Sequence, residues 1–187
     1  MSEEVLIYIE DAKEKMKKAI NHLENELVKI RAGKANPMML QGIIVDYYGS
    51  KVPINQVASI NTTDARSIVI QPWDKKMIEV IEKAIFAANI GLTPINNGEV
   101  IRLNVPPLTE ERRHELVKQV KHEGEIAKVS IRNSRREAIE EIKKLQKEGI
   151  PEDEIKKAEE DIQKQTDQFI KKIDEILHNK EVEIMSV

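Results

Sequence analysis

The stretch TEERRHELVKQVKHEGEIAKVSIRNSRREAIEEIKKLQKE, residues 109–148, decides the fold of this chain. No proline interrupts it, and helix-forming residues continue to its end. Thr109 is placed to cap a helix, and Glu110 and Glu111 suit the positive end of the helix dipole. At 1.5 Å per residue, such a helix reaches roughly 60 Å. Apolar and small residues recur at steps of three and four, which predicts one buried stripe along it. The residues expected to face inward are Val117, Val120, Gly124, Ala127, Ile131, Ser134, Ala138, Ile142 and Leu145.

Two further segments show the same spacing of apolar residues. In residues 2–30 the expected inward residues are Val5, Ile9, Ala12, Met16, Ile20, Leu23, Leu27 and Ile30. A last helix is expected from Pro151 to Asn179, followed by an acidic tail. Its inward residues are Ile155, Ala158, Ile162, Thr166, Phe169, Ile173 and Ile176. Because one helix cannot bury a narrow apolar stripe alone, the three segments are predicted to form a three-helix bundle.

The segment between the first two helices has a different composition. Residues 32–106 hold most of the glycines and prolines, together with runs of β-branched residues. The expected strands are 42–48, paired with 51–58 as a hairpin, then 67–71 and 100–104, the last preceded by an Asn97-Gly98 turn. This pattern predicts a small α+β unit.

An amphipathic helix is expected within this unit, at residues 75–89. Its inward residues are predicted to be Ile78, Ile81, Ile85 and Phe86, with Gly91 as its C-cap. Trp73, which precedes the helix, is expected to pack against the core rather than to bind a ligand.

These elements predict an α+β protein with two domains. Residues 1–30 and 106–187 are expected to form an elongated three-helix bundle, and residues 31–105 an inserted domain. The insert joins one end of the bundle through two closely spaced connections. We therefore expect an elongated, bent molecule in which these connections act as a hinge.

Composition and motifs exclude several classes of site. The 187 residues include no cysteine, which excludes disulfides, thiolate metal sites and a cysteine nucleophile. The four histidines are scattered without metal-ligand spacing, and no GxxxxGK phosphate loop or acid/base pair is present. We expect no catalytic residue, metal or cofactor. The N-terminal residues resemble neither a secretory signal nor a transit peptide, and no apolar run reaches membrane-spanning length, so we expect a soluble cytoplasmic protein.

The charge of the chain is unevenly distributed. The whole chain carries a net charge of -3, but residues 112–136 contain eight Lys or Arg against three Glu, which gives +5. Residues 126–136, IAKVSIRNSRR, contain no acid at all, and we call this segment the basic stretch. On a helix its four cations, Lys128, Arg132, Arg135 and Arg136, lie close together and are expected to bind phosphate. The alternative is that they pair with the last helix, since residues 149–187 contain six cations against eleven acids, which gives -5.

Four other cations are candidates for the same kind of contact. Arg31 and Lys34 flank Gly33 at the end of the first helix, where positive charge also favours the helix dipole. Arg112 and Arg113 lie in the first turn of the long helix, where cations oppose the dipole, so they either bind nucleic acid or pair with a Glu. Aromatic residues are absent from the basic stretch, which disfavours binding of single strands by base stacking. Phosphates of folded RNA or of a duplex remain the expected ligands.

Five separated motifs together span most of the chain. They are KIRAGKANP (29–37), VDYYGSKVPINQVASI (45–60), EKAIFAANIGLTP (82–94), VPPLTEERR (105–113) and SIRNSRREA (130–138). In these motifs and in their order the chain resembles the ribosome recycling factor family of bacteria. The resemblance implies an L-shaped protein with a three-helix bundle and an inserted β/α/β domain on a flexible hinge.

The resemblance also implies a function. Members bind the post-termination ribosome across the A and P sites of the large subunit and, with elongation factor G and GTP, split it into subunits without catalysing a reaction themselves. Carried over to this chain, Arg132 is a key contact to large-subunit rRNA, and Lys128, Arg135 and Arg136 are its neighbours. Arg31 and Lys34 lie in the matching RAGKANP motif, where many relatives have Arg in place of Lys34.

Two other functions stay open at this point. A helical scaffold would use its apolar stripe to form oligomers, whereas the recycling hypothesis predicts a monomer. An RNA-processing enzyme would need a clustered acid and base, which the sequence does not offer.

Overall fold

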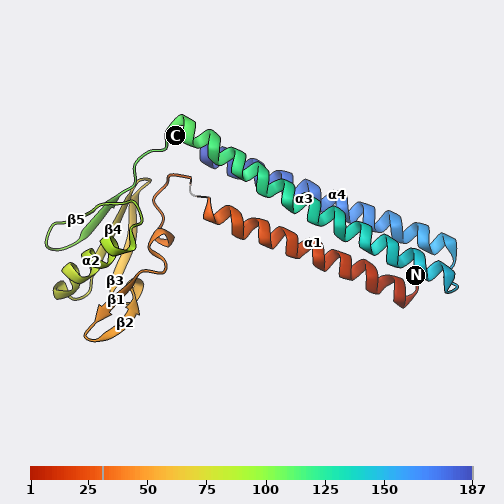
Figure 1. The fold of residues 1–187 in the computed structure, drawn as a ribbon, viewed down its shortest axis with the longest axis horizontal. Helices are drawn as coiled ribbons and strands as arrows, with labels where there is room; N and C mark the ends of the chain where they lie inside the picture. Colours follow the sequence, from red (N-terminus) through yellow and green to blue (C-terminus); the bar gives the residue numbers. More distant parts are fainter. Residues whose placement is uncertain (31, 187) are drawn as a thin grey trace. The chain divides into compact units, whose positions relative to one another are not determined.

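The computed structural model describes residues 1–30 and 32–186, and the contacts divide the chain into two units. One unit combines Met1–Ala32 with Glu110–Val187, and the other is Gly33–Thr109. Figure 1 shows that the first consists of long helices and that the second holds the strands and one shorter helix. The Pro106-Pro107 pair belongs to the second unit.

The described part of the first unit is a bundle of three helices. They are α1 (Glu3–Lys29), α3 (Glu110–Lys147) and α4 (Glu152–Met185), and each packs against the other two. In Figure 1, α3 runs antiparallel to both α1 and α4. Every inward residue predicted for α1 is buried, as are eight of the nine predicted for α3.

The exceptions are one predicted inward residue of α3 and two of α4. Leu116 is buried in place of the predicted Val117, which is only half-buried. Phe169 and Ile176 of α4 are also half-buried, although they were predicted to face inward. A straight α-helix has 3.6 residues per turn, so a stripe extrapolated at a fixed 3.5-residue spacing drifts away from the core.

Helix α4 is longer than the sequence pattern indicated. The expected end near Asn179 is wrong, because α4 continues to Met185. Ile184 is fully buried, and it continues the buried stripe from Ile173 by helical steps. The intervening charged residues are good helix formers, and Lys180 pairs with Glu183 at 3.3 Å. The acidic tail is therefore the last part of the bundle.

A glycine lets α3 and α4 approach closely. Gly124 of α3 lies against the side chain of Leu177, and a Cβ atom at position 124 would overlap it. Backbone proximity of this kind locks the rotation of α3 about its axis.

The second unit combines an antiparallel sheet, a hairpin and a helix. The hairpin pairs β1 (Ile44–Tyr47) with β2 (Ser50–Pro53). The sheet has the strand order β3-β4-β6-β5, with β3 (Ala58–Asp64), β4 (Ser67–Pro72), β5 (Pro94–Asn96) and β6 (Ile101–Asn104). The hairpin and strands β4 and β6 were predicted, whereas β3 as a strand of the sheet, and β5, were not.

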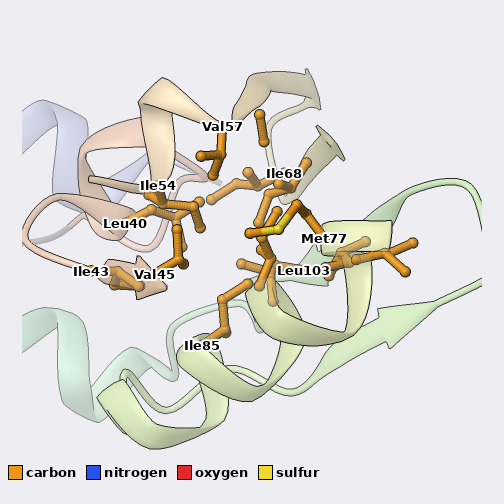
Figure 2. Packing of buried hydrophobic residues seen from close by; sticks show 14 residues of the cluster. Leu40, Ile43, Val45, Ile54, Val57, Ile68, Met77, Ile85 and Leu103 are labelled. Carbon is orange, nitrogen blue, oxygen red and sulfur yellow. The ribbon is translucent and has the colours of Figure 1, made fainter. Parts of the chain in front are cut away.

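Apolar side chains from the hairpin and from β3, β4 and β6 form one core with the helix of the second unit. Ile68 of β4 lies opposite Leu103 of β6, and Ile70 lies opposite Ile101, so four fully buried residues share one face of the sheet. Helix α2 (Ile78–Ala88) covers them with Ile81 and Ile85. Figure 2 shows Met77 and Ile85 converging with Ile68 and Leu103, and with Leu40, Val45 and Ile54 from the hairpin side.

Two predictions for α2 are wrong. Phe86 is 56% exposed rather than buried, because neighbouring helix positions differ by about 100° and Ile85 takes the inward direction. The C-cap is Asn89, with φ at +47°, rather than Gly91. Asn adopts the left-handed conformation more readily than most residues, so the helix closes two residues early.

Both ends of the second unit are fastened to the turn between β3 and β4. The Ala35 amide donates to the Ala65 carbonyl at 2.8 Å, and the Val105 amide donates to the Arg66 carbonyl at 2.7 Å. Gly33, with φ at +73°, packs so tightly that an added Cβ would lie 2.6 Å from Leu108 Cγ. The incoming and outgoing chains are thereby held together.

We predict that Ile184→Ala lowers the free energy of unfolding by about 2–4 kcal/mol, because it leaves a cavity in the bundle. Chemical denaturation measures the loss. The control is Val182→Ala on the exposed side of the same turn, which should change stability by less than about 0.5 kcal/mol. Equal effects of the two variants would contradict the docking of the final turn.

We predict that Gly33→Ala destabilises the second unit more than Gly42→Ala does. Both glycines have positive φ, which costs alanine about 1–2 kcal/mol, but no atom lies within 4 Å of a Cβ at position 42. The overlap with Leu108 should add about 1–3 kcal/mol at position 33. Thermal unfolding compares the two, and Leu108→Ala should recover part of the loss in the Gly33→Ala background. The same loss at both glycines would refute the tight contact.

Candidate nucleic-acid interface

The basic stretch lies in the middle of α3, and three buried residues set its orientation. Ala127, Ile131 and Ser134 face the core of the bundle. The Ser134 hydroxyl is satisfied by donating to the Ser130 carbonyl at 3.0 Å, so burying it leaves no unpaired group. Since α3 cannot rotate, the four cations are divided between two directions.

Arg132 and Arg136 face away from the core. Both side chains are exposed, they are one helical turn apart, and neither makes a hydrogen bond or ion pair with any residue that the structure describes. Val129, 50% exposed, lies one turn before Arg132 on the same face. Two guanidinium groups beside an apolar side chain form a surface suited to the phosphates and sugars of a nucleic acid.

The acid next to Arg136 does not neutralise it. Glu137 binds Lys15 of α1 instead, with 3.3 Å between Lys15 Nζ and Glu137 Oε2. The hydrogen bonds that Lys15 donates to Asp11 and to Glu137 raise the pKa of Lys15. The link between α1 and α3 therefore occupies the carboxylate that could have competed for the arginines.

Lys128 is directed toward α4. Its Nζ lies 2.7 Å from Asp174 Oδ1 and 3.9 Å from Glu125 Oε1, and its side chain is only 17% exposed. Lys128 therefore pairs with the acidic last helix, as the alternative hypothesis expected for the cations of the basic stretch.

Arg135 is also directed toward α4, but its partner is neutral. Its Nη1 donates to Gln163 Oε1 at 2.7 Å, and Gln163 Nε2 donates in turn to Asp167 Oδ1 at 2.8 Å. The bond to Asp167 orients the amide so that its oxygen faces the arginine. Arg135 is half-buried, and its Nε atom lies buried without a partner among the described residues.

The two arginines at the start of α3 have partners within the bundle. Arg112 Nη1 lies 2.8 Å from Glu115 Oε2, which matches the alternative of pairing with a Glu. Arg113 is half-buried, and its Nη1 approaches the Met185 carbonyl at 3.4 Å. A cation at the last carbonyls of α4 suits the negative end of that helix, so Arg113 acts as a C-cap between helices.

The other two sequence candidates are Arg31 and Lys34. Arg31 falls outside the described residues. Lys34 is exposed in the second unit and makes no ion pair within the described ranges 1–30 and 32–186. Its position next to Gly33 places it beside the fastened ends of that unit.

The second unit has an apolar hollow that the sequence did not predict. Its volume is about 970 Å³, and no charged residue lines it. Met38, Ile44 and Trp73 contribute exposed apolar side chains, so the expectation that Trp73 packs in the core is wrong. Trp73 sits at the turn between β4 and α2, where Pro72 and Asp74 bracket it, and such a turn position is the signal that favoured exposure.

A hydrogen bond fixes the aromatic residues near this hollow. The Tyr48 hydroxyl donates a hydrogen bond to Asp74 Oδ2, with 2.6 Å between the two oxygens. The rings of Tyr47 and Tyr48 pack edge to face, with 4.8 Å between their centroids. This bond raises the pKa of Tyr48 and lowers the pKa of Asp74. These aromatic side chains belong to the second unit, whereas the basic stretch belongs to the first.

Within the described residues, no cluster of three or more His, Cys, Asp or Glu side chains could hold a metal ion. None of the helices described is both long and apolar enough to span a bilayer.

Comparison with known proteins assigns the chain to a family. A family model described as "Ribosome recycling factor" matches residues 23–185. The chain belongs to the ribosome recycling factor family. The ribosome-recycling factor of Phocaeicola vulgatus is 60% identical over 179 residues, which cover 96% of each chain. That of Flavobacterium psychrophilum is 56% identical over 187 residues and the whole of both chains.

Solved structures of ribosome recycling factors have the same fold. A solution structure of one factor matches over 100% of both chains with a TM-score of 0.77 and 45% identity. A second structure contains the T. thermophilus ribosome recycling factor and E. coli elongation factor G bound to the E. coli post-termination complex. It matches 97% of this chain and 99% of that chain, with a TM-score of 0.61 and 44% identity. The α+β architecture of a helical bundle with a small β-containing unit is therefore that of the family.

Proposed function

We propose that this chain recycles bacterial ribosomes after termination. In this role it binds the large subunit across the A and P sites and, with elongation factor G and GTP, splits the post-termination ribosome. Family membership supports the role, and so does the related factor solved with elongation factor G on a post-termination complex. The chain acts in the cytoplasm as a monomer and catalyses no reaction of its own.

The observation that carries the proposed binding mode is the outward pair Arg132 and Arg136. Each guanidinium has a planar fork that matches two phosphate oxygens, and both lack competing protein partners among the described residues. We propose that these two arginines are the primary contacts to large-subunit rRNA. Lys128 and Arg135 would support them from the α4 side.

The remaining cations have graded roles in this proposal. Arg31 and Lys34 form a second contact to rRNA, and the single charge of Lys34 binds phosphate without a bidentate fork. Arg112 and Arg113 contribute less, since their guanidinium groups already have partners in Glu115 and Met185.

The proposed mechanism is mechanical. The bundle grips rRNA, while the second unit, joined through a hinge, receives the force of elongation factor G. Movement of the bundle then disrupts the contacts between the ribosomal subunits. Binding by phosphate contacts implies that affinity falls steeply as salt rises.

We predict that Arg132→Glu and Arg136→Glu each reduce binding to purified large subunits at least tenfold, while the helical content and unfolding temperature stay unchanged. Each reversal removes an attraction and adds a repulsion to phosphate. Co-sedimentation across a salt series measures the affinity, and its dependence on log salt should become shallower by about 0.7–0.9 per lost contact.

The matched control is Lys164→Glu, which makes the same charge change on the exposed face of α4 and should bind nearly as the parent does. A parallel assay follows subunit splitting with elongation factor G and GTP. Normal splitting by the Arg132→Glu variant would overturn the proposed contact. A dimer mass at low salt would favour the scaffold hypothesis instead.

A further inference from the structure

The contact between the basic stretch and α4 separates its four cations by accessibility. Arg132 and Arg136 are exposed, whereas Lys128 and Arg135 are bound by side chains of α4. A basic stretch that served only to attract RNA would gain from four accessible cations. The structure instead places an acid directly on one of them.

We propose that Asp174 competes with RNA phosphate for Lys128 and thereby limits the affinity of the bundle for rRNA. This inference rests on the proposed function and refines it. It assigns a role to Asp174, whose negative charge would itself repel RNA phosphate. In this proposal Lys128 contacts phosphate only when its ion pair with Asp174 is broken, and Asp174 is the residue that positions it.

The geometry suits a contact that can exchange. Lys128 Nζ lies 2.7 Å from Asp174 Oδ1, which is a direct ion pair, yet the Asp174 side chain is 57% exposed. Pairs with one exposed partner are weak, typically below about 1 kcal/mol, so a phosphate oxygen can replace the carboxylate. The long, flexible lysine stem lets Nζ move from α4 toward the face of Arg132 without any change in the helix.

Arg135 provides an internal contrast. Its partner Gln163 carries no charge, and its half-buried guanidinium is fixed by the Gln163–Asp167 chain of hydrogen bonds. Removing the negative charge of Asp174 therefore leaves Lys128 with only the longer, 3.9 Å contact to the exposed Glu125 and leaves Arg135 in place. The two cations on the α4 side can be tested separately.

A limit on affinity fits a factor that must leave the ribosome. Each additional phosphate contact strengthens binding and makes it more dependent on salt. An acid that holds one cation back reduces the number of contacts in the bound state and so shortens the lifetime of the complex.

The test is binding to purified large ribosomal subunits across a salt series. The variant Asp174→Asn should bind about two- to fivefold more tightly at low salt, and its salt dependence should steepen by about 0.7–0.9, which corresponds to one more phosphate. The matched control is Glu175→Gln, which removes the same charge one residue away, where the acid is exposed and makes no ion pair with any described residue.

A double-mutant cycle assigns the gain to Lys128. Lys128→Ala should weaken binding of the parent less than Arg132→Ala does, and it should abolish the gain in the Asp174→Asn background. Equal gains from Asp174→Asn and Glu175→Gln would show a general charge effect and overturn the inference. So would a loss from Lys128→Ala alone as large as that from Arg132→Ala. If Arg132→Ala also leaves binding unchanged, the proposed function fails as well.

Discussion

Burial of the apolar stripe of α3 against α1 and α4 is the constraint on which the other features depend. Residues such as Ile131 and Ile142 are fully buried, and Gly124 brings the backbone of α3 against Leu177. These contacts fix the rotation of α3, because turning the helix would expose several apolar side chains at roughly 1.5–3 kcal/mol each. The direction of every cation on α3 follows from this rotation.

The same packing divides the four cations of the basic stretch between two surfaces. One lies outward, where Arg132 and Arg136 have no competing partner within the described residues. The other lies between α3 and α4, where Lys128 meets Asp174 and Arg135 meets Gln163. The acidic residue Asp174 of α4 thus makes Lys128 less accessible than Arg132 and Arg136, whereas the partner of Arg135 is neutral.

Much of the fold could be predicted from periodicity. The stripes of α1 and α3, the first hairpin and the break at residues 149–151 are all set by local rules of spacing, turns and caps. The extension of α4 to Met185 could not be predicted in this way, because tertiary burial of Ile184 decides it. Strand β5 is three residues long and depends on pairing with β6, a contact that its own sequence does not specify.

The candidate interface was only partly predictable. Composition located the basic stretch, and helical spacing grouped its cations. Whether Lys128 faces solvent or Asp174 depends on the angle between two packed helices, which a single sequence does not contain. The exposure of Trp73 and the hollow beside it depend in the same way on how the hairpin and sheet of the second unit come together.

We propose that the outward face of α3 touches large-subunit rRNA, and a site-specific probe tests this directly. The chain contains no cysteine, so Val129→Cys creates a unique attachment point for an iron chelate one turn from Arg132. Hydroxyl radicals generated there on the bound factor should cleave large-subunit rRNA at a few discrete positions. The same probe at Lys164→Cys, on the exposed face of α4, should cleave those positions weakly or not at all. Cleavage of those positions only from position 164, with none from position 129, would contradict the account.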